Sequence, residues 1–303
     1  WIYSLVFFIV FLFIVLELSD IDFGFIEYAD VDYRLSGPFG DEAIVGSFIL
    51  AYMFYYAYLL KEFQFNRNIS IIFLVISFFS ILLSGERMSF IMLVFCFLIY
   101  IIHFSIFKIE NNKLIFIKKY LGIILILPLL IACVFLVIKS TLNEERLDSY
   151  KFRMNQTLGE LKNFEKTSYF THFKTSYFIF MDNKIIGKGV KSFRYECGKE
   201  IYDFVDNNPH NRCRTHPHNI YLEILSEIGI IGFLLLSINF YFLLRELFKK
   251  NNFYNNFFLY LPIIYYLWPL KTSGSFFSSI YGSLIWYFIA FFIIVINSRD
   301  RIQ

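Results

Sequence analysis

Long apolar runs restrict this sequence to one class of fold more strongly than any other feature. Of the 303 residues, 57% are hydrophobic and 22% are aromatic. The apolar side chains gather in eight runs of about 15 to 20 residues, close to the length of a helix that crosses a bilayer. A soluble protein does not need this much apolar surface, so we predict an integral membrane protein of the all-α class. The runs lie at roughly 1–16, 44–60, 69–83, 88–107, 120–138, 228–244, 256–270 and 279–297.

The basic residues between the runs predict the orientation of the chain in the membrane. Alternate short connections are rich in Lys and Arg, and the positive-inside rule places them in the cytoplasm. These cations are Lys61, Arg67, Lys108, Lys113, Lys118, Lys119, Arg245, Lys249, Lys250, Arg299 and Arg301. The short connections on the other side hold only Arg34, Arg87 and Lys271. The segments expected outside are therefore 17–43, 84–87, 139–219 and 271–278.

We expect residues 1–303 to form one membrane domain with one large outer insert, 139–219, because no linker or tandem repeat interrupts the pattern. The sequence begins with Trp1 inside an apolar run, which indicates a fragment without its natural N-terminus. That run has neither a basic leader nor a small-residue cleavage site, so it is interpreted as a truncated span and not as a signal peptide. The net charge of +3 is too small to indicate a nucleic-acid partner.

The polar insert meets the next apolar run in a distinctive stretch. Residues Arg212 to Gly232 read RCRTHPHNIYLEILSEIGIIG, in which two histidines flank Pro217. The stretch then becomes helical, and Asn219, Glu223 and Glu227 share one face. A histidine is thus expected where a transmembrane helix meets water.

The run THPHNIYLEILSEIGIIG resembles the signature of the O-antigen ligase and O-antigen polymerase superfamily. Weaker similarities occur at RLSGPFGDEAIVGSFI from Arg34, SGER from Ser84 and GKGVKSFR from Gly187. The resemblance implies a polytopic transmembrane helical bundle, GT-C-like, whose large extracytoplasmic insert is partly helical. It also implies an enzyme of the bacterial inner membrane whose active site faces the periplasm.

The activity implied by the resemblance is transfer of a glycan from a polyprenyl-pyrophosphate carrier to an acceptor. A ligase uses lipid A-core as the acceptor, whereas a polymerase uses another carrier-linked glycan. We favour a ligase-like enzyme of lipopolysaccharide biosynthesis, with the polymerase as the alternative. Neither a cofactor nor a metal is expected.

His218 is the predicted catalytic residue. A neutral imidazole at the mouth of a membrane helix can accept a proton from a sugar hydroxyl as that oxygen attacks the anomeric carbon. The alternative is a histidine that caps or packs at the start of the helix. The resemblance implies that the second histidine of the motif is essential, which favours catalysis.

Three neighbours of His218 are predicted to contact the substrate: Arg214, His216 and Asn219. Asn219 can instead cap the following helix through free backbone N–H groups. Two histidines and Cys213 also raise the possibility of a metal site. We reject it because residues on either side of a proline tend to point apart, and no third ligand has suitable spacing.

Arg87 and Arg34 are the predicted contacts for the pyrophosphate. Arg87 lies in SGER between two apolar runs, where a cation is costly unless it is paired or faces a wet cavity. A guanidinium fork can bind phosphate oxygens and offset charge that grows on the leaving group. A local ion pair, such as Arg87 with Glu86, is the alternative. Arg34 stands among acidic residues, so a surface salt bridge is its alternative role.

Cys197 and Cys213 both fall in the outer insert, where oxidising conditions favour a disulfide; two free thiols are the alternative. The bond would close a loop of about seventeen residues, worth about 3 kcal/mol in the chain-entropy model.

The nearby run GKGVKSFR resembles a phosphate loop superficially, but it lacks the Walker spacing, so we do not assign it that role.

Two functions of other classes fit an integral membrane protein. A transporter or flippase of lipid-linked glycans would place charges near the bilayer midplane, whereas here they gather at the outer mouth. A receptor or structural subunit would use the insert as a binding domain. Loss of activity on replacement of His218 would separate the enzyme from the receptor.

Overall fold

The computed structural model describes residues 2–19, 34–40, 44–64, 66–107, 144–247, 257–272 and 274–300. Over these residues the chain forms α-helices and short 3-10 helices without any β-strand, as the all-α prediction requires. The chain divides into two compact units, Trp1–Gln156 and Thr157–Gln303. The apolar run 120–138 and the basic connection before it lie outside the described residues.

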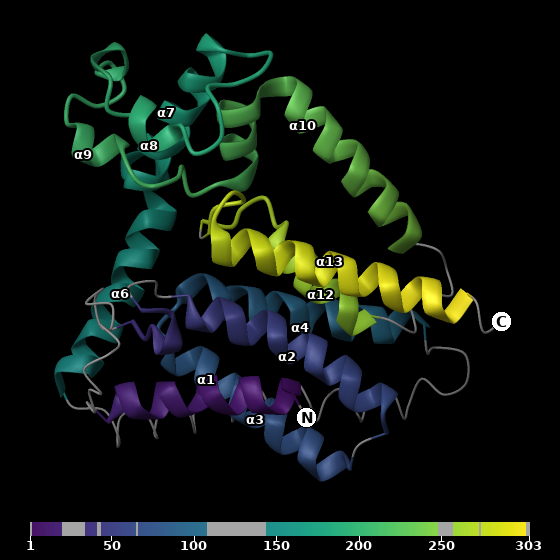
Figure 1. The fold of residues 1–303 in the computed structure, drawn as a ribbon. Helices are drawn as coiled ribbons and strands as arrows, with labels where there is room; N and C mark the ends of the chain where they lie inside the picture. The colour runs from purple at the N-terminus through teal and green to yellow at the C-terminus, as the bar shows by residue number, and fades with distance from the viewer. Residues whose placement is uncertain are drawn as a thin grey trace. The chain divides into compact units, whose positions relative to one another are not determined.

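The first unit is built around helix α2. It holds α1 (Ile2–Leu18), η1 (Gly37–Phe39), α2 (Val45–Glu62), α3 (Arg67–Leu83) and α4 (Arg87–Phe107). Helix α2 contacts the other three long helices (Figure 1). Aromatic rings fill the space between these helices: the Phe7 ring lies 4.5 Å from that of Phe73, which lies 4.4 Å from that of Tyr56. The core of this unit is therefore apolar and aromatic.

The outer faces of these helices are also apolar. Large side chains such as Phe8 on α1 and Ile72 on α3 are 60% and 58% exposed. Water would penalise such surfaces, whereas lipid would not. Among the described residues, Ile220–Arg245 has the length and hydropathy of a membrane-crossing helix, and four shorter apolar helices accompany it. The complete set of eight spans stays a prediction.

The second unit contains most of the predicted insert. After α6 (Glu144–Lys162), which crosses the boundary between the units, come η2 (Phe164–Lys166), α7 (Ser168–Asp182), α8 (Phe193–Glu196), η3 (Glu200–Tyr202) and α9 (Pro209–Arg212). The chain continues as α10 (Ile220–Leu247), α12 (Phe257–Tyr266) and α13 (Ser279–Asp300). Helix α7 packs against α10 and α9, and α12 packs against α13. The described part of the insert, 144–219, is partly helical, as predicted.

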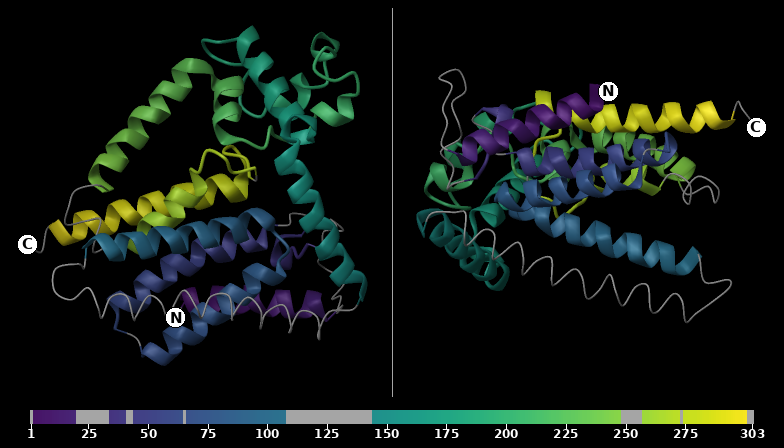
Figure 2. Two further views of the ribbon diagram at one scale, coloured as in Figure 1. Left: turned by 180° about the vertical axis from the view of Figure 1, so that it is seen from behind. Right: turned by 90° about the horizontal axis from the view of Figure 1, so that it is seen from below.

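Helix α10 is broken at Gly229, where φ is +67° and ψ is −169°. The bend is visible in Figure 1 and, from behind, in Figure 2. A break leaves backbone groups without intrahelical partners. The loop between α7 and α8 supplies them: Lys188 N and Gly189 N donate to the carbonyls of Ser226 and Glu227, at 2.9 and 2.8 Å.

The same loop also accepts hydrogen bonds from the far side of the break. Ile230 N donates to Lys184 O at 2.8 Å, and Ile231 N donates to Ile185 O at 3.2 Å. The two backbones approach so closely that a Cβ atom on Gly187 would lie 2.5 Å from Glu227 O. The GKG run (residues 187–189) was given no role from the sequence. Together with the residues directly before it, this run holds the two parts of the broken helix against each other.

Candidate functional site

Asn219 caps the first turn of α10. Its Oδ1 atom accepts hydrogen bonds from Tyr221 N and Leu222 N, both at 3.1 Å. Its Nδ2 atom donates to Pro269 O at 2.8 Å. The capping role is confirmed, and contact of Asn219 with a substrate stays a prediction.

His218 precedes this cap in an unusual backbone conformation. Its φ is +58°, in the left-handed region that most side chains avoid, although histidine, asparagine and aspartate occur there more often than others. The imidazole Nδ1 atom lies 3.1 Å from Thr272 O. A carbonyl oxygen can only accept, so the Nδ1 atom carries the proton in this bond. In the neutral ring the basic lone pair is therefore on Nε2.

Three histidines gather around this point. The His218 ring centroid lies 4.4 Å from that of His216 and 5.3 Å from that of His172 on α7. The Tyr169 ring meets His218 edge-on at 5.5 Å. The expectation that the rings of His216 and His218 point apart is wrong, because the left-handed turn at His218 brings its ring back beside His216.

His172 was not found from the sequence, since a histidine on an amphipathic helix carries no signal of its own. It is 2% exposed, and neither of its ring nitrogens has a hydrogen-bond partner among the residues that the structure describes. Burial is the main cause that lowers the pKa of His172 to about 4; the nearby His218 and Arg214 lower it further, and the backbone of Asn211 acts in the opposite direction. Burial, with His218, His172 and Arg194, lowers the pKa of His216 to about 3. Both rings are therefore neutral at pH 7.

These low pKa values predict that acid weakens the insert. In the unfolded chain both histidines take up a proton near their ordinary pKa of 6.5, whereas the folded protein binds it only near pH 4 and pH 3. The free energy of unfolding should thus fall as pH drops below 6.5, by up to about 1.4 kcal/mol per pH unit for each histidine. Thermal unfolding of wild type and His172→Phe between pH 7 and 4 checks this. An equal pH dependence in the two proteins would contradict it.

The loop between α12 and α13 holds the start of α10 in place. Leu267 O accepts from the Tyr221 hydroxyl at 2.6 Å. The Glu223 carboxylate accepts from Phe276 N at 2.8 Å and from the Ser275 hydroxyl. With the bonds to His218 and Asn219, this loop contacts the motif at four positions, so the ring of His218 is oriented by a segment distant in sequence.

Lys271, in the same loop, is 3% exposed and enclosed by tyrosines. Its Nζ atom lies 3.7 Å from the centre of the Tyr265 ring and 4.3 Å from that of Tyr281, and it donates to the Tyr281 hydroxyl. Cation–π attraction is strongest where water is excluded. These contacts of the ammonium group therefore hold Lys271 in place. Its neighbour in the sequence, Thr272, contacts the ring of His218.

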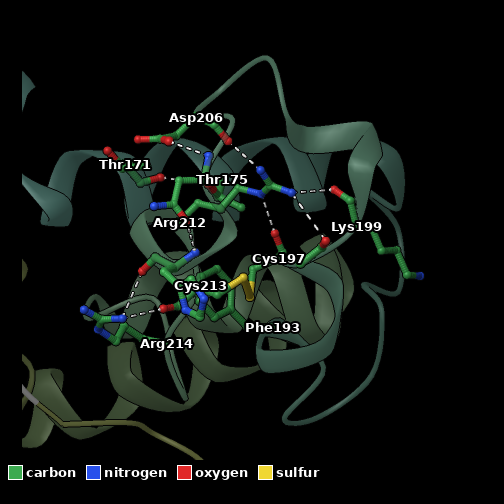
Figure 3. The surroundings of a disulfide bond; sticks show 12 residues. Thr171, Thr175, Phe193, Cys197, Lys199, Asp206, Arg212, Cys213 and Arg214 are labelled. Atoms are coloured by element: carbon green, nitrogen blue, oxygen red, sulfur yellow. Dashed lines mark hydrogen bonds between the residues drawn. A yellow bond between two sulfur atoms is a disulfide. The ribbon is translucent and has the colours of Figure 1, made fainter.

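A disulfide joins Cys197 to Cys213, whose Cα atoms are 5.3 Å apart (Figure 3). Arg212 lies beside it with no exposed surface. The guanidinium donates to the carbonyls of Cys197, Asp206 and Lys199 at 2.7, 2.5 and 3.1 Å, and pairs with Asp203 at 2.6 Å. Arg212 is thus a structural cation that holds the chain around the disulfide.

The disulfide predicts the outcome of peptide mapping and the effect of removing both cysteines on stability. Peptide mapping without reductant should give one linked pair that contains Cys197 and Cys213. Because the bond restricts the unfolded chain, a Cys197→Ser/Cys213→Ser variant should lose about 3 kcal/mol of unfolding free energy. Cys96→Ser, at a free cysteine elsewhere, is the control for the loss of a thiol. Recovery of both insert cysteines fully alkylated without reductant would contradict the expectation.

Arg214, one residue beyond the disulfide, is exposed. Its Nη1 atom donates to the carbonyls of His210 and Cys213, both at 3.0 Å (Figure 3). Arg214 also contributes to the low pKa of His172, so its charge acts at the histidine cluster. The side chain is held near this cluster while its surface stays open to solvent.

Arg34 and Arg87 lie in the first unit on neighbouring backbone segments. Leu35 N donates to Ser84 O at 3.0 Å, which joins the RLSG run to the SGER run. The Glu86 carboxylate accepts from Ser47 N at 2.6 Å and from the Ser47 hydroxyl, at the start of α2. The structure therefore joins the backbone segments that carry Arg34 and Arg87. The Glu86 carboxylate therefore binds the first turn of α2.

The described residues contain no group of three His, Cys, Asp or Glu side chains arranged to hold a metal ion. The sequence matches a family model described as O-antigen ligase over residues 72–237, just over half of the chain. The matched region runs from α3 through the bend in α10, so it includes Arg87, the histidine cluster and the GKG clamp. No curated protein matches the sequence.

Proposed function

The chain belongs to the O-antigen ligase family of integral inner-membrane, glycosyltransferase-like enzymes of lipopolysaccharide biosynthesis, and on that premise we propose its reaction. It transfers a glycan from a polyprenyl-pyrophosphate carrier to an acceptor at the periplasmic face of the membrane. We favour lipid A-core as the acceptor, as in a ligase. The donor is bound in the bilayer by its polyprenyl chain, with the pyrophosphate at the mouth of the protein.

His218 acts as the general base in this proposal. The hydrogen bond from its Nδ1 atom to Thr272 O is the observation that carries it, because that bond leaves the basic lone pair on Nε2. Nε2 accepts the proton of an acceptor hydroxyl as the hydroxyl oxygen attacks the anomeric carbon. The bond from that carbon to the pyrophosphate oxygen breaks, and its electrons leave with the carrier.

The departing pyrophosphate needs positive charge more than it needs a proton, since its own negative charge is already delocalised. Arg87 supplies a guanidinium fork to the phosphate oxygens, and Arg34 supplies a second. Arg214 and His216 contact the glycan or the pyrophosphate beside His218. The backbone bond between the segments of Arg34 and Arg87 supports a shared role for these two cations.

Arg87→Lys should reduce transfer about 10²-fold or more, because an ammonium group cannot reproduce the bidentate contact of a guanidinium. The measurement is the rate with purified carrier-linked glycan and acceptor in lipid nanodiscs. Arg245→Lys, at the end of α10, is the control that keeps the same change away from the proposed pyrophosphate contacts. An Arg87→Lys enzyme as active as wild type would remove Arg87 from the mechanism.

The glycan profile of a deletion strain tests the choice of acceptor. Loss of all capped lipopolysaccharide is expected for a ligase, whereas retention of single capped units is the result for a polymerase.

Addition of EDTA to the purified assay tests the proposed independence from metal. Activity that EDTA abolishes and magnesium restores would transfer the role of the arginines to a metal ion.

A further inference from the structure

The loop that clamps α10 exposes an unusual amount of apolar surface. We call residues 184–191, between α7 and α8, the clamp loop. Ile185, Ile186 and Val190 are 64%, 70% and 56% exposed. Three large aliphatic side chains this open within eight residues are unfavourable in water, and such a patch marks a surface that meets lipid or another molecule.

The position of the clamp loop along α10 indicates what it meets. Lys184 O and Ile185 O accept hydrogen bonds from Ile230 and Ile231, at the start of the long segment after the break. That segment carries exposed apolar side chains from Ile230, which is 39% exposed, onward to Phe242, which is 55% exposed. In an integral membrane protein such a surface lies in lipid. The clamp loop is therefore joined to the membrane-crossing helix where its apolar surface begins.

Cations flank this apolar patch in the sequence. Lys184, Lys191 and Arg194 are exposed on and directly after the clamp loop. Tyr195, which follows them, is 74% exposed. Aliphatic side chains beside lysine, arginine and tyrosine are typical of segments at the membrane interface, because the apolar groups enter the acyl boundary and the cations meet lipid phosphates.

The clamp loop is also held rigidly, which distinguishes it from a mobile surface loop. Glu227 accepts from Lys191 N at 2.5 Å and from Phe193 N at 3.3 Å. With the bonds to both sides of the helix break, its backbone is fixed in one conformation. The exposed isoleucines are therefore presented in place, and little conformational entropy is lost when lipid covers them.

We propose that the clamp loop docks into the outer leaflet of the membrane, with Ile185 and Ile186 in the acyl boundary and its cations on the phosphates of anionic phospholipids. This keeps the start of α10, with His218, at the level of the lipid headgroups. This docking requires that α10 crosses the membrane. It does not require that the protein catalyses the proposed glycosyl transfer.

A fluorescent probe at residue 186 tests the docking. An Ile186→Cys variant, in a background with Cys96 and Cys133 replaced and the disulfide kept, is labelled with an environment-sensitive dye in nanodiscs. We expect blue-shifted emission that lipids brominated in the acyl chains quench. Ile201→Cys is the matched control, because Ile201 is an isoleucine of the same insert with 62% exposure and lies outside the clamp loop. Its probe should stay in water.

A probe at residue 186 that reports water in nanodiscs would overturn the proposal. So would a blue-shifted probe that brominated lipid leaves unquenched, because protein would then cover the loop. Lys184→Gln/Lys191→Gln should reduce the quenching at residue 186 in anionic nanodiscs and leave it unchanged in zwitterionic ones. Equal quenching in anionic nanodiscs with and without the two lysines would contradict the proposed contact of these cations with the phosphates of anionic phospholipids. Circular dichroism and the disulfide map confirm that each variant is folded.

Discussion

His218→Asn is expected to lower the rate of glycan transfer by about 10²–10⁴, the usual contribution of a general base. Asparagine tolerates the backbone conformation at φ +58°, so this variant removes the basic nitrogen without the strain that alanine would add. The side chain of asparagine can still donate to Thr272 O but cannot take a proton from a hydroxyl. Binding of the carrier should change little, so the loss should appear in kcat and not in KM.

The control for this experiment is His210→Asn. His210 is exposed on α9. Its backbone N–H donates to Asn208, and its carbonyl accepts from Arg214, and both bonds use backbone atoms that the substitution keeps. This variant makes the same chemical change in the same insert and should keep full activity. A His218→Asn enzyme with the activity of wild type, measured with purified carrier-linked glycan and acceptor, would rule out His218 as the base.

Gly187→Ala is expected to destabilise the second unit by about 2–5 kcal/mol. Part of this loss arises because φ at Gly187 is +69°, a conformation that alanine adopts at a cost. The larger part arises because the new Cβ atom would lie 2.5 Å from Glu227 O, and backbone atoms cannot move aside without breaking the clamp. Gly229→Ala should behave alike, since its Cβ atom would lie 2.5 Å from the Ile185 carbonyl carbon.

Gly189→Ala separates the two causes. Gly189 also has a positive φ, +106°, but a Cβ atom there would meet no other atom within 4 Å. This variant should therefore show only the backbone cost of its positive φ, about 1–3 kcal/mol. Thermal unfolding and limited proteolysis of the three variants provide the comparison. Equal stability of Gly187→Ala and Gly189→Ala would show that close approach of the two backbones is not what holds the helix break.

The sequence alone determined the all-helical class of the fold. Apolar runs need no tertiary information to predict helices, because length and hydropathy are local properties. The cap at Asn219 also followed from local chemistry, and the two insert cysteines paired by the sequence are joined in the structure. The resemblance of the THPHN stretch agrees with the family match. The roles of His218, Arg34, Arg87, Arg214 and His216 stay predictions.

Only the tertiary structure decided how the site is built. Thr272 O sets the protonated nitrogen of His218, His172 joins it from α7, and the GKG run holds the break at Gly229. In each case the partners are far apart in the sequence, and neither residue's local pattern specifies the other. Such contacts arise when packing brings the loop between α12 and α13, and the loop between α7 and α8, against α10. Hydrophobic periodicity fixes which residues form helices, but the partners of buried polar groups are fixed only when the helices pack.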